Sequence, residues 1–325
     1  MRTTGADMAK ILMTGASSFS GLWIAEALAA AGHEVTAPVR RARTDYSGLR
    51  AERVERLATS VQLVFEAPFA SPAFAELAGG GFDVLAHHAA DIPNYRSASY
   101  DVMEGVNRNL LGAEAVLSAF ASSGGKAVIA TGTAFEAGEG HAEPGDLAVS
   151  PYGLSKTLTN EALRHFACWR GLSFGKFVIA GPFGPLEKGR FGWSLFQRWF
   201  AGEAGLVRTP RYVRDNIPVP LLAQAYAALV RDLMDGAEAD QKISRPSGFV
   251  GTQEAFAHLL AREMAPRLGL ACRVEAASQP ELAEPLVRVN SDPWITPDWP
   301  QAVFWDDYAA YYQRIAAAGL LSAPA

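Results

Sequence analysis

The chain has 325 residues, of which 49% are hydrophobic and 19% charged, a balance that is typical of a folded globular protein and excludes a disordered chain. Its formal net charge is -5, so the composition indicates neither a nucleic-acid nor a membrane-surface partner. Two distant cysteines, Cys168 and Cys272, predict no disulfide framework and no zinc site, which suits a reducing cytoplasm. No apolar run reaches the roughly 18–20 residues of a membrane span. The first ten residues lack the apolar core of a signal peptide, and Met8 is an alternative start to Met1.

The first half of the sequence alternates short apolar runs with longer helical patterns, which predicts βαβ units on a parallel sheet. The predicted strands are 10–13, 34–39, 61–65, 82–86, 126–130 and 175–179. The predicted helices are 21–31, 100–122 and 152–170. We therefore expect an α/β fold with a Rossmann-type doubly wound parallel sheet in residues 8–180, to which residues 216–236 return.

The second half of the sequence loses this alternation. Residues 181–214 are rich in Gly, Pro, Trp and Phe, and they predict loops with one short helix near 193–201, followed by a helix within 217–235. We expect residues 181–215 and 237–325 to form mainly a smaller α/β lid that binds substrate at the carboxyl edge of the sheet, where open α/β sheets bind ligands. The aromatic residues at helical spacing either form the core of this lid or line its pocket; they are Trp193, Phe196, Trp199 and Phe200.

A glycine-rich turn follows the first predicted strand and precedes the first predicted helix. In such a strand–turn–helix unit, backbone N–H groups and the helix N-terminus bind a pyrophosphate. Gly15 permits the tight turn, Gly21 lets the helix pack closely, and Ser18 can offer its hydroxyl to the phosphate. An ordinary Gly/Ser turn is the alternative. The predicted cofactor-binding residues of the turn are Gly15, Ser17, Ser18, Phe19 and Gly21.

The end of the second predicted strand bears on the choice between NAD and NADP. NAD sites usually carry an acid there, which binds the ribose hydroxyls. Here the strand ends in Val39-Arg40-Arg41, and no acid precedes Asp45. Because guanidinium groups suit a 2′-phosphate, Arg40 favours NADP(H), with NAD(H) as the alternative. These arginines can also be an ordinary solvated strand end.

The most informative pair of residues is Tyr152 and Lys156, which lie one turn apart on the same face of a predicted helix. Hydride transfer to a carbonyl needs a proton for the forming alkoxide. A free tyrosine has a pKa of about 10, and a nearby ammonium lowers it. A hydroxyl can polarise the substrate oxygen, and Thr133 is the first candidate, with Thr131 second. By itself the Tyr-x-x-x-Lys spacing also fits an amphipathic helix start.

Five motifs in this order resemble the extended short-chain dehydrogenase/reductase family, the NAD(P)-dependent sugar-nucleotide epimerases, dehydratases and reductases. The resemblance covers about residues 10–235. Ser18 replaces the middle glycine of the family's Thr-Gly-x-x-Gly-x-x-Gly. The segments that carry the resemblance are Thr14 to Gly21, His87-His88-Ala89-Ala90, Asn109-Leu110-Leu111-Gly112, Thr133 to Gly138, and Tyr152 with Lys156.

The resemblance assigns roles to further residues. It implies that Asn109 supports the active-site lysine, and it selects Thr133 over Thr131 as the catalytic hydroxyl. It implies a homodimer through the helices that carry Asn109 and Tyr152. The cofactor-binding residues that it adds are Glu66, Ala67, His88, Ala89, Ala90, Tyr152, Lys156 and Pro182. The substrate-binding residues are Thr133, Phe183 and Arg214.

Departures from the family pattern leave the substrate open. Gly181 replaces an Asn that often touches a nucleotide-sugar diphosphate, and Pro220 replaces the usual acid after the Arg214 motif. Phe135 stands where a dehydratase usually has an acid, which argues against dehydration. His87 and His88 are adjacent and so cannot easily share a metal ion, and we expect no metal.

The expected function is that of an NAD(P)-dependent oxidoreductase or epimerase acting on a secondary alcohol or ketone. A nucleotide-sugar 4-keto reductase or 4-epimerase fits the resemblance best. Tyr152 would be the acid/base, Lys156 would lower its pKa, and Thr133 would donate to the substrate oxygen. An NADPH-dependent reductase of a non-nucleotide carbonyl compound is an alternative, and a non-catalytic NADP-sensing protein is an alternative of another class.

Overall fold

The computed structural model describes residues 8–91, 94–95, 97–141, 143, 145–237, 239–279, 281–282 and 284–321. The chain divides into two compact units. The first consists of Met1–Ile179 with Leu222–Arg245, and the second of Ala180–Leu221 with Pro246–Ala325.

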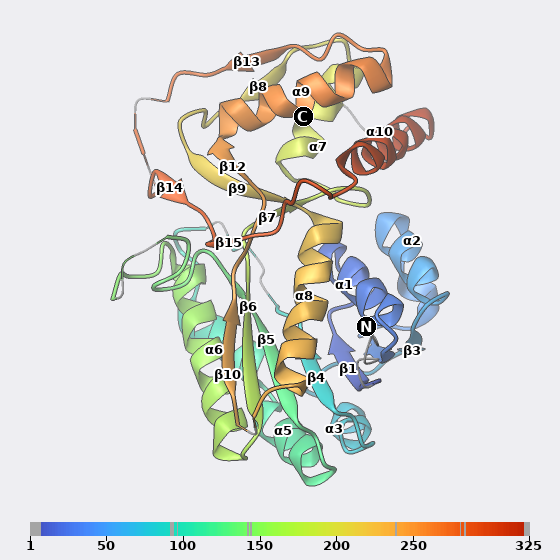
Figure 1. The fold of residues 1–325 in the computed structure, drawn as a ribbon, viewed down its shortest axis with the longest axis vertical. Coiled ribbons are helices and arrows are strands. Elements are labelled where there is room, and N and C mark those ends of the chain that lie inside the picture. Colours follow the sequence, from blue (N-terminus) through green and yellow to red (C-terminus); the bar gives the residue numbers. More distant parts are fainter. Residues whose placement is uncertain are drawn as a thin grey trace. The chain divides into compact units, whose positions relative to one another are not determined.

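A seven-stranded parallel sheet forms the centre of the first unit (Figure 1), and its order is β10-β6-β5-β4-β1-β2-β3. The order reverses between β1 and β4, as in a Rossmann-type doubly wound sheet, which confirms the predicted fold class. The strands are β1 (Lys10–Thr14), β2 (Glu34–Pro38), β3 (Gln62–Val64), β4 (Val84–His87), β5 (Ala127–Thr133), β6 (Ser173–Ile179) and β10 (Gln241–Ser244).

Strand β10 is the part of this sheet that the sequence analysis misses. Residues 237–325 were expected mainly in the lid, but Gln241–Ser244 pair in parallel with Phe174–Phe177 of β6. The burial pattern of β10 alternates between exposed and half-buried residues, as it does on an edge strand. Such a strand has no continuous apolar run to mark it in the sequence.

Helices cover both faces of the sheet (Figure 1). Helices α3, α5 and α6 pack on one face through a buried apolar cluster that includes Phe120 and Phe174. Helix α8 packs on the other face, where a Cβ at Gly175 would lie 2.7 Å from Leu233 Cδ1. Because neighbouring strand residues face opposite sides, Phe174 and Gly175 meet different helices. The helices of this unit are α1 (Phe19–Ala30), α2 (Gly48–Leu57), α3 (Pro72–Ala78), α4 (Val102–Leu110), α5 (Ala113–Ser122), α6 (Pro151–Trp169) and, from Leu222 onward, α8 (Val219–Met234).

The single helix predicted over 100–122 is wrong, because the structure divides it into α4 and α5. Gly112 adopts a φ of 75°, and Leu111 leaves the helical region with a ψ of 122°. A Cβ at Gly112 would also lie 3.0 Å from Ala70 Cα. The left-handed conformation and the close backbone contact both favour glycine here, and they break the helix.

In the part of the second unit that the structure describes, a four-stranded sheet is combined with two short strand pairs and with helices α7, α9 and α10. In the larger sheet β9 pairs with β7, β12 and β14, and the short pairs are β8–β13 and β11–β15. The helices are α7 (Phe191–Phe200), α9 (Gln253–Leu268) and α10 (Gln301–Ala317). The strands are β7 (Gly181–Phe183), β8 (Gly205–Val207), β9 (Val213–Pro218), β11 (Pro246–Ser247), β12 (Phe249–Thr252), β13 (Val274–Ala276), β14 (Val287–Arg288) and β15 (Asp292–Pro293).

The core of the second unit is rich in aromatic rings. Trp193, Phe196 and Trp199 of α7 are buried, and Phe196 stacks on Tyr312 of α10 at a centroid distance of 3.5 Å. Buried Glu187 accepts hydrogen bonds from the hydroxyls of Tyr308 and Tyr312, while burial raises the pKa of its carboxyl. These α7 residues therefore form core, which was the first of the two expectations for them.

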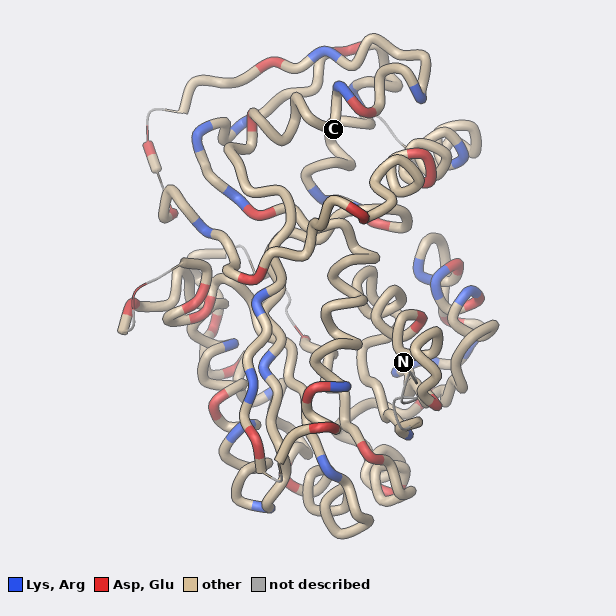
Figure 2. Tube along the Cα trace, in the orientation of Figure 1, with Lys and Arg blue, Asp and Glu red and all other residues tan. Residues whose placement is uncertain are grey.

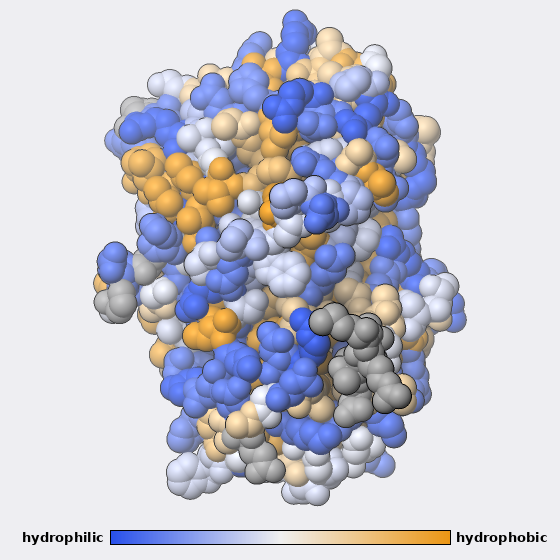
Figure 3. Space-filling view, viewed as in Figure 1, coloured by the Kyte–Doolittle hydropathy of each residue, from blue (hydrophilic) through white to orange (hydrophobic). Residues whose placement is uncertain are grey.

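The surface carries both signs of charge. Figure 2 shows basic and acidic residues interspersed along the chain, and Figure 3 shows a mainly polar face interrupted by apolar patches. Within the part of the chain that the structure describes, no helix is both long and apolar enough to cross a membrane. In the same residues, no group of three or more His, Cys, Asp or Glu side chains is placed to hold a metal ion.

Candidate active site

The turn between β1 and α1 depends on two glycines. Gly15 has a φ of 76°, and a Cβ there would lie 2.7 Å from the backbone nitrogen of Ala89. A Cβ at Gly21 would lie 2.2 Å from the carbonyl oxygen of Gly15. The first turn of α1 therefore packs directly on the end of β1, as a dinucleotide-binding turn requires.

Polar groups complete this turn. Ser18 is the N-cap of α1, and its Oγ accepts the Gly21 N–H at 3.1 Å. Buried Arg53 of α2 donates to the carbonyl oxygen of Ser17 at 3.3 Å. The first turn of α1 contains no acidic residue, so no side-chain charge there offsets the positive end of the helix dipole. The turn thus fits a pyrophosphate, with Phe19 buried as the first helical residue.

The end of β4 is bound to its neighbours by hydroxyl groups. Thr14 Oγ1 contacts His87 Nδ1 at 3.1 Å and accepts the Ala89 N–H at 3.0 Å. The His88 ring lies between Ser20 Oγ at 3.0 Å and Thr131 Oγ1 at 2.9 Å. Burial and the charge of Lys156 lower the pKa of His87 to about 3 and that of His88 to about 4, so both rings are neutral at pH 7. The backbone from 88 to 90, where Ala90 is exposed, is thereby held beside Gly15.

The segments that follow β2 and β3, where the predicted cofactor-binding residues Glu66 and Ala67 lie, are joined by backbone hydrogen bonds. The N–H of Ala67 donates to the carbonyl oxygen of Val39 at 3.0 Å, and the N–H of Glu66 donates to that of Arg41 at 3.4 Å. Arg40 is exposed at the end of β2. The two predicted residues Glu66 and Ala67 therefore lie beside the strand end that carries Arg40.

Tyr152 lies in the first turn of α6, and its ring is surrounded by other aromatic rings. Tyr95, Tyr100 and Phe135 meet it edge-on at centroid distances of 5.4, 6.1 and 6.1 Å. Thr133 at the end of β5 lies beside Tyr152, and its side chain lowers the pKa of the Tyr152 hydroxyl. Thr131 instead contacts His88 and Tyr226, so the structure brings Thr133 rather than Thr131 to Tyr152.

The net shift in the pKa of Tyr152 is upward in this structure, and the lowering expected from Lys156 stays a prediction. Burial raises the pKa of Tyr152, the negative charge of Glu136 raises it further, and only the side chain of Thr133 acts in the opposite direction. Lys156 is itself buried, and burial lowers the pKa of its ammonium. Removal from water penalises both charged forms, which outweighs the proximity that the sequence suggests. Tyr152 is therefore protonated at pH 7.

Asn109 of α4 holds the loop that follows β4. Its Oδ1 accepts the N–H of Asp91 at 2.7 Å, while its Nδ2 donates to the carbonyl oxygens of Asp91 at 3.1 Å and Gly105 at 2.8 Å. The resemblance implies that Asn109 supports Lys156 through backbone and water. In this structure its hydrogen bonds go to the backbone of Asp91 and Gly105, and its role toward Lys156 stays a prediction.

The second unit contains a pair of arginines on neighbouring strands. Arg214 of β9 and Arg288 of β14 are register partners, and both contact Glu284, at 2.9 and 3.0 Å. Arg214 also donates to the carbonyl oxygens of Val213, Pro285 and Leu286. Arg214, which was predicted to bind substrate, is thus already paired with Glu284 in its own unit. No motif in the sequence marked Arg288, which only the strand pairing brings to Arg214.

The two other predicted residues of this unit lie in its core. Phe183 is buried, and its ring meets Phe256 and Phe304 at centroid distances of 5.1 and 5.4 Å. Pro182 is buried beside Ile217, its register partner on β9. The expectation that Phe183 binds substrate has no support in this packing, because neighbouring aromatic rings cover its side chain.

A comparison with known protein families agrees with the dinucleotide-binding turn that the geometry of the first unit indicates. The family model for the NAD dependent epimerase/dehydratase family matches residues 11–217. The chain belongs to this family. Its members form the extended group of the short-chain dehydrogenases/reductases, which confirms the resemblance in the sequence. A search of the curated proteins finds no match.

Solved structures share the fold of this epimerase/dehydratase family member. UDP-glucose 4-epimerase from Thermotoga maritima matches with a TM-score of 0.68 and 16% identity, over 94% of this chain and 99% of that chain. UDP-glucuronic acid 4-epimerase from Bacillus cereus matches with 0.70 and 16%, over 94% and 99%. UDP-glucose 4-epimerase from Thermus thermophilus, in complex with NAD, matches with 0.67 and 21%, over 94% and 99%. At these identities the likeness shows the fold.

Gly21→Ala tests the cofactor turn of this family member. The added methyl group meets the Gly15 carbonyl oxygen, so α1 must shift, and we expect the Kd for the nicotinamide dinucleotide to rise at least about tenfold. Isothermal titration with NAD+ and NADP+ measures this, and urea unfolding checks the fold. Gly251→Ala is the matched control, because its Cβ would meet only Ala255 Cβ at 3.8 Å. An unchanged Kd in the folded Gly21→Ala protein would contradict the assignment.

Proposed function

We propose that this protein is an NAD(P)-dependent epimerase that inverts a secondary alcohol carbon of a nucleotide sugar. The observation that carries this proposal is the placement of Thr133 beside Tyr152, with Lys156 one turn along α6, in the same unit as the Gly15–Gly21 turn. Membership of the epimerase/dehydratase family supports it. The names of the structural neighbours, which are 4-epimerases of UDP-sugars, give further support.

The residues of the first unit would divide the chemistry among them. Gly15, Ser18 and Gly21 would hold the pyrophosphate at the start of α1. A bound oxidised nicotinamide would supply a hydride acceptor and a positive charge, which favours the Tyr152 phenolate. The Tyr152 phenolate would take the proton from the substrate hydroxyl and return it to that oxygen after inversion. Thr133 would donate a hydrogen bond to that oxygen as negative charge develops there.

The second unit offers cationic groups for a diphosphate. Arg214 and Arg288 share one carboxylate, Glu284, so the three side chains carry a net positive charge. Burial lowers the pKa of Arg288 to about 10, and this value leaves the guanidinium charged at pH 7. We propose that the phosphates of a nucleotide sugar bind this arginine pair, since guanidinium groups bind phosphate in a bidentate manner.

A second candidate is an NADPH-dependent reductase of a carbonyl compound that carries no nucleotide. Two observations favour it: Arg214 is already paired with Glu284, and Gly181 offers no side chain to a diphosphate. A nucleotide-sugar 4-keto reductase would share its substrate class with the first candidate and its net reduction with the second. An epimerase retains its cofactor through the cycle, whereas a reductase releases the oxidised form. Product analysis without added cofactor therefore separates these possibilities.

Tyr152→Phe tests the proposed acid/base in an assay of UDP-glucose, UDP-galactose, UDP-N-acetylglucosamine and UDP-glucuronic acid. We expect the wild-type protein to epimerise at least one of them, and Tyr152→Phe to lower kcat by at least about 100-fold with cofactor binding retained, because the variant lacks the transferable proton. Tyr311→Phe is the control, since it removes a buried hydroxyl that bonds the Glu187 carbonyl oxygen in the second unit. Unchanged turnover in Tyr152→Phe would contradict the mechanism. A wild type that binds cofactor but turns over neither these sugars nor simple ketones with NADPH would favour the sensing alternative, whereas turnover of ketones alone would favour the second candidate.

Arg40→Ala tests the proposed preference for NADP(H). Arg40 is exposed and the end of β2 carries no acid, so we expect the wild type to bind NADP(H) more tightly than NAD(H). Removing one solvated guanidinium should raise the Kd for NADP(H) about 3- to 10-fold and leave that for NAD(H) unchanged. Fluorescence titration measures both, and Arg231→Ala, at an exposed residue of α8, is the control. Tighter binding of NAD(H) by the wild type would refute the role given to Arg40.

We also propose a homodimer through α4 and α6, which pack against each other. Met103 and Leu111, at the ends of α4, are 60% and 64% exposed, and Leu154 and Leu158 of α6 are 42% and 40% exposed. Leu154 and Leu158 are four residues apart and so lie on one face of the helix. A second copy of this chain would cover this apolar surface.

Leu158→Asp should weaken this dimer, because it places a charge in an apolar interface. Light scattering after size exclusion should give twice the mass of one chain for the wild type and the mass of one chain for the variant. Val303→Asp on α10 is the control, since Val303 is 58% exposed and lies outside α4 and α6. A monomeric wild type would refute the proposal.

A further inference from the structure

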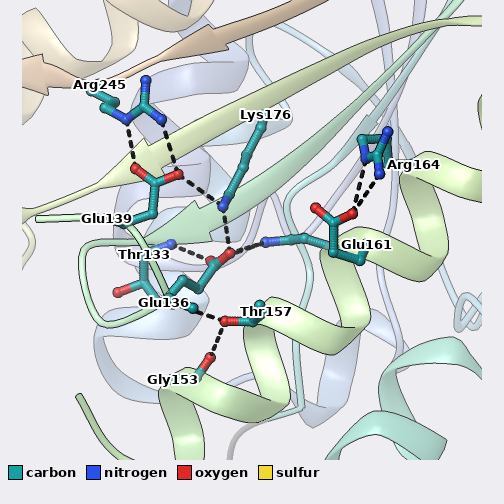
Figure 4. A network of polar contacts seen from close by, with 11 residues as sticks. Thr133, Glu136, Glu139, Gly153, Thr157, Glu161, Arg164, Lys176 and Arg245 are labelled. Atoms are coloured by element: carbon teal, nitrogen blue, oxygen red, sulfur yellow. Dashed lines mark hydrogen bonds and ion pairs between the residues drawn. The ribbon is translucent and has the colours of Figure 1, made fainter. Parts of the chain in front are cut away.

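A buried carboxylate holds the end of β5, and the chemistry proposed above does not use it (Figure 4). Glu136 is fully buried in the turn after β5. Its Oε1 accepts the backbone N–H of Thr133 at 2.7 Å. Asn160 Nδ2 donates to both carboxylate oxygens, at 2.9 and 3.0 Å. The carboxylate therefore connects the residue that carries the proposed catalytic hydroxyl to helix α6.

Glu136 belongs to a chain of four alternating charges. Lys176 Nζ lies 2.7 Å from Glu136 Oε2 and 2.9 Å from Glu139 Oε1, and Arg245 Nε lies 2.6 Å from Glu139 Oε2 (Figure 4). Two carboxylates and two cations give this chain no net charge. A buried ion is costly unless it is paired and hydrogen-bonded, and each oxygen of Glu136 has such a partner.

One face of α6 is fitted to the turn that carries Glu136. Gly153 approaches the turn so closely that a Cβ there would lie 2.1 Å from the carbonyl oxygen of Phe135. Thr157 Oγ1 accepts the N–H of Ala137 at 3.0 Å, and Asn160 binds Glu136. The spacing of Gly153, Thr157 and Asn160 places them along one face of the helix. Tyr152 directly precedes Gly153, and Lys156 directly precedes Thr157. If the turn after β5 moved, its position relative to Tyr152 and Lys156 would therefore change.

The space around the carboxylate is also fixed by the fold. A Cβ at Gly132 would lie 2.7 Å from Glu136 Oε1 and 3.2 Å from Asn160 Nδ2. Glycine at 132 thus leaves room for the Glu136 side chain beside β5. A side chain that the strand accommodates in this way has a defined position, which a surface carboxylate does not.

The charge of Glu136 also reaches the proton-transfer pair. It raises the pKa of Tyr152, as the neighbouring Tyr95 and Tyr100 also do, and it raises that of Lys156, whereas Lys176 lowers that of Lys156. Glu139 and Arg245 complete the charged groups around Glu136. Loss of this one negative charge would therefore lower the pKa of Tyr152.

We propose that Glu136 is a positioning residue, whose carboxylate fixes the Thr133 backbone against α6 and keeps the Thr133 hydroxyl beside Tyr152. This inference rests on the proposed function only in taking Tyr152 as the acid/base. Its charge makes a second, separable contribution, because it acts on Tyr152 and Lys156 through space.

Two variants separate position from charge. Glu136→Val removes both, and we expect kcat to fall about 10- to 100-fold with KM and the cofactor Kd within about threefold of wild type, since misplaced catalytic groups lose rate rather than binding. Glu136→Gln keeps an acceptor for the Thr133 N–H, so kcat should fall less. In this variant the limb of the kcat–pH profile that reports the acid/base should move to lower pH, because a negative charge has been removed. Glu161→Gln is the matched control, since Glu161 pairs with Arg164 at the surface of the same helix (Figure 4).

A merely structural role gives different results. If Glu136 only neutralised Lys176, the double variant Glu136→Val/Lys176→Met would regain wild-type kcat, and that recovery would overturn the proposal. We expect the double variant to stay as slow as Glu136→Val. An unmoved pH profile in Glu136→Gln, together with wild-type kcat, would also overturn it.

Hydrogen–deuterium exchange gives a readout that needs no substrate. Amides of the peptide 131–137 should exchange faster in Glu136→Val than in wild type, and at wild-type rates in Glu161→Gln. Unchanged protection in folded Glu136→Val would refute the anchoring of Thr133. If the wild type epimerises no nucleotide sugar, the proposed function fails, while the exchange measurement still decides the role of Glu136.

Discussion

The close approach of helix α6 to the turn after β5 is the constraint on which the candidate site depends. Gly153 lets the helix backbone come against the Phe135 carbonyl, and Thr157 and Asn160 bind the same turn further along the helix. Because Tyr152 and Lys156 belong to the same two turns of helix, one packing contact places both of them relative to Thr133. The proposed acid/base pair is therefore positioned by one close backbone approach and by two side-chain hydrogen bonds to the same turn.

Burial in this site opposes the charged forms of its two ionisable groups, Tyr152 and Lys156. Burial of Tyr152 among aromatic rings excludes water and raises the pKa of its hydroxyl, and burial of Lys156 lowers the pKa of its ammonium. Burial thus disfavours the charged form of each group in the protein alone. A further positive charge, as on an oxidised nicotinamide, would reverse the balance for the tyrosine. Nearby, Glu136, Lys176, Glu139 and Arg245 cancel in pairs, so they fix the β5 turn without adding net charge.

Strong local patterns in the sequence predicted much of the fold. The strand–turn–helix at the start, the alternation of apolar runs and the Tyr152 helix all have short-range causes, and the family and fold class followed from them. The predictions failed where the decisive contact is distant in sequence. The predicted helix over 100–122 breaks at Gly112 because that backbone packs on Ala70, and β10 joins the sheet only because β6 offers a free edge. Phe183 lies in an aromatic core that contains residues more than 60 positions away.

The sequence by itself marked the residues of the first unit to which we assign chemistry, because Gly15, Gly21, Tyr152 and Lys156 are recognised from spacings of a few residues on one turn or one helix. The tertiary structure alone decided what surrounds them. It bound Arg214 to Glu284, placed Arg288 beside it, and buried Glu136 against the end of β5. The physical reason is that charge pairing and desolvation depend on which groups meet in space, and those partners lie tens of residues apart along the chain.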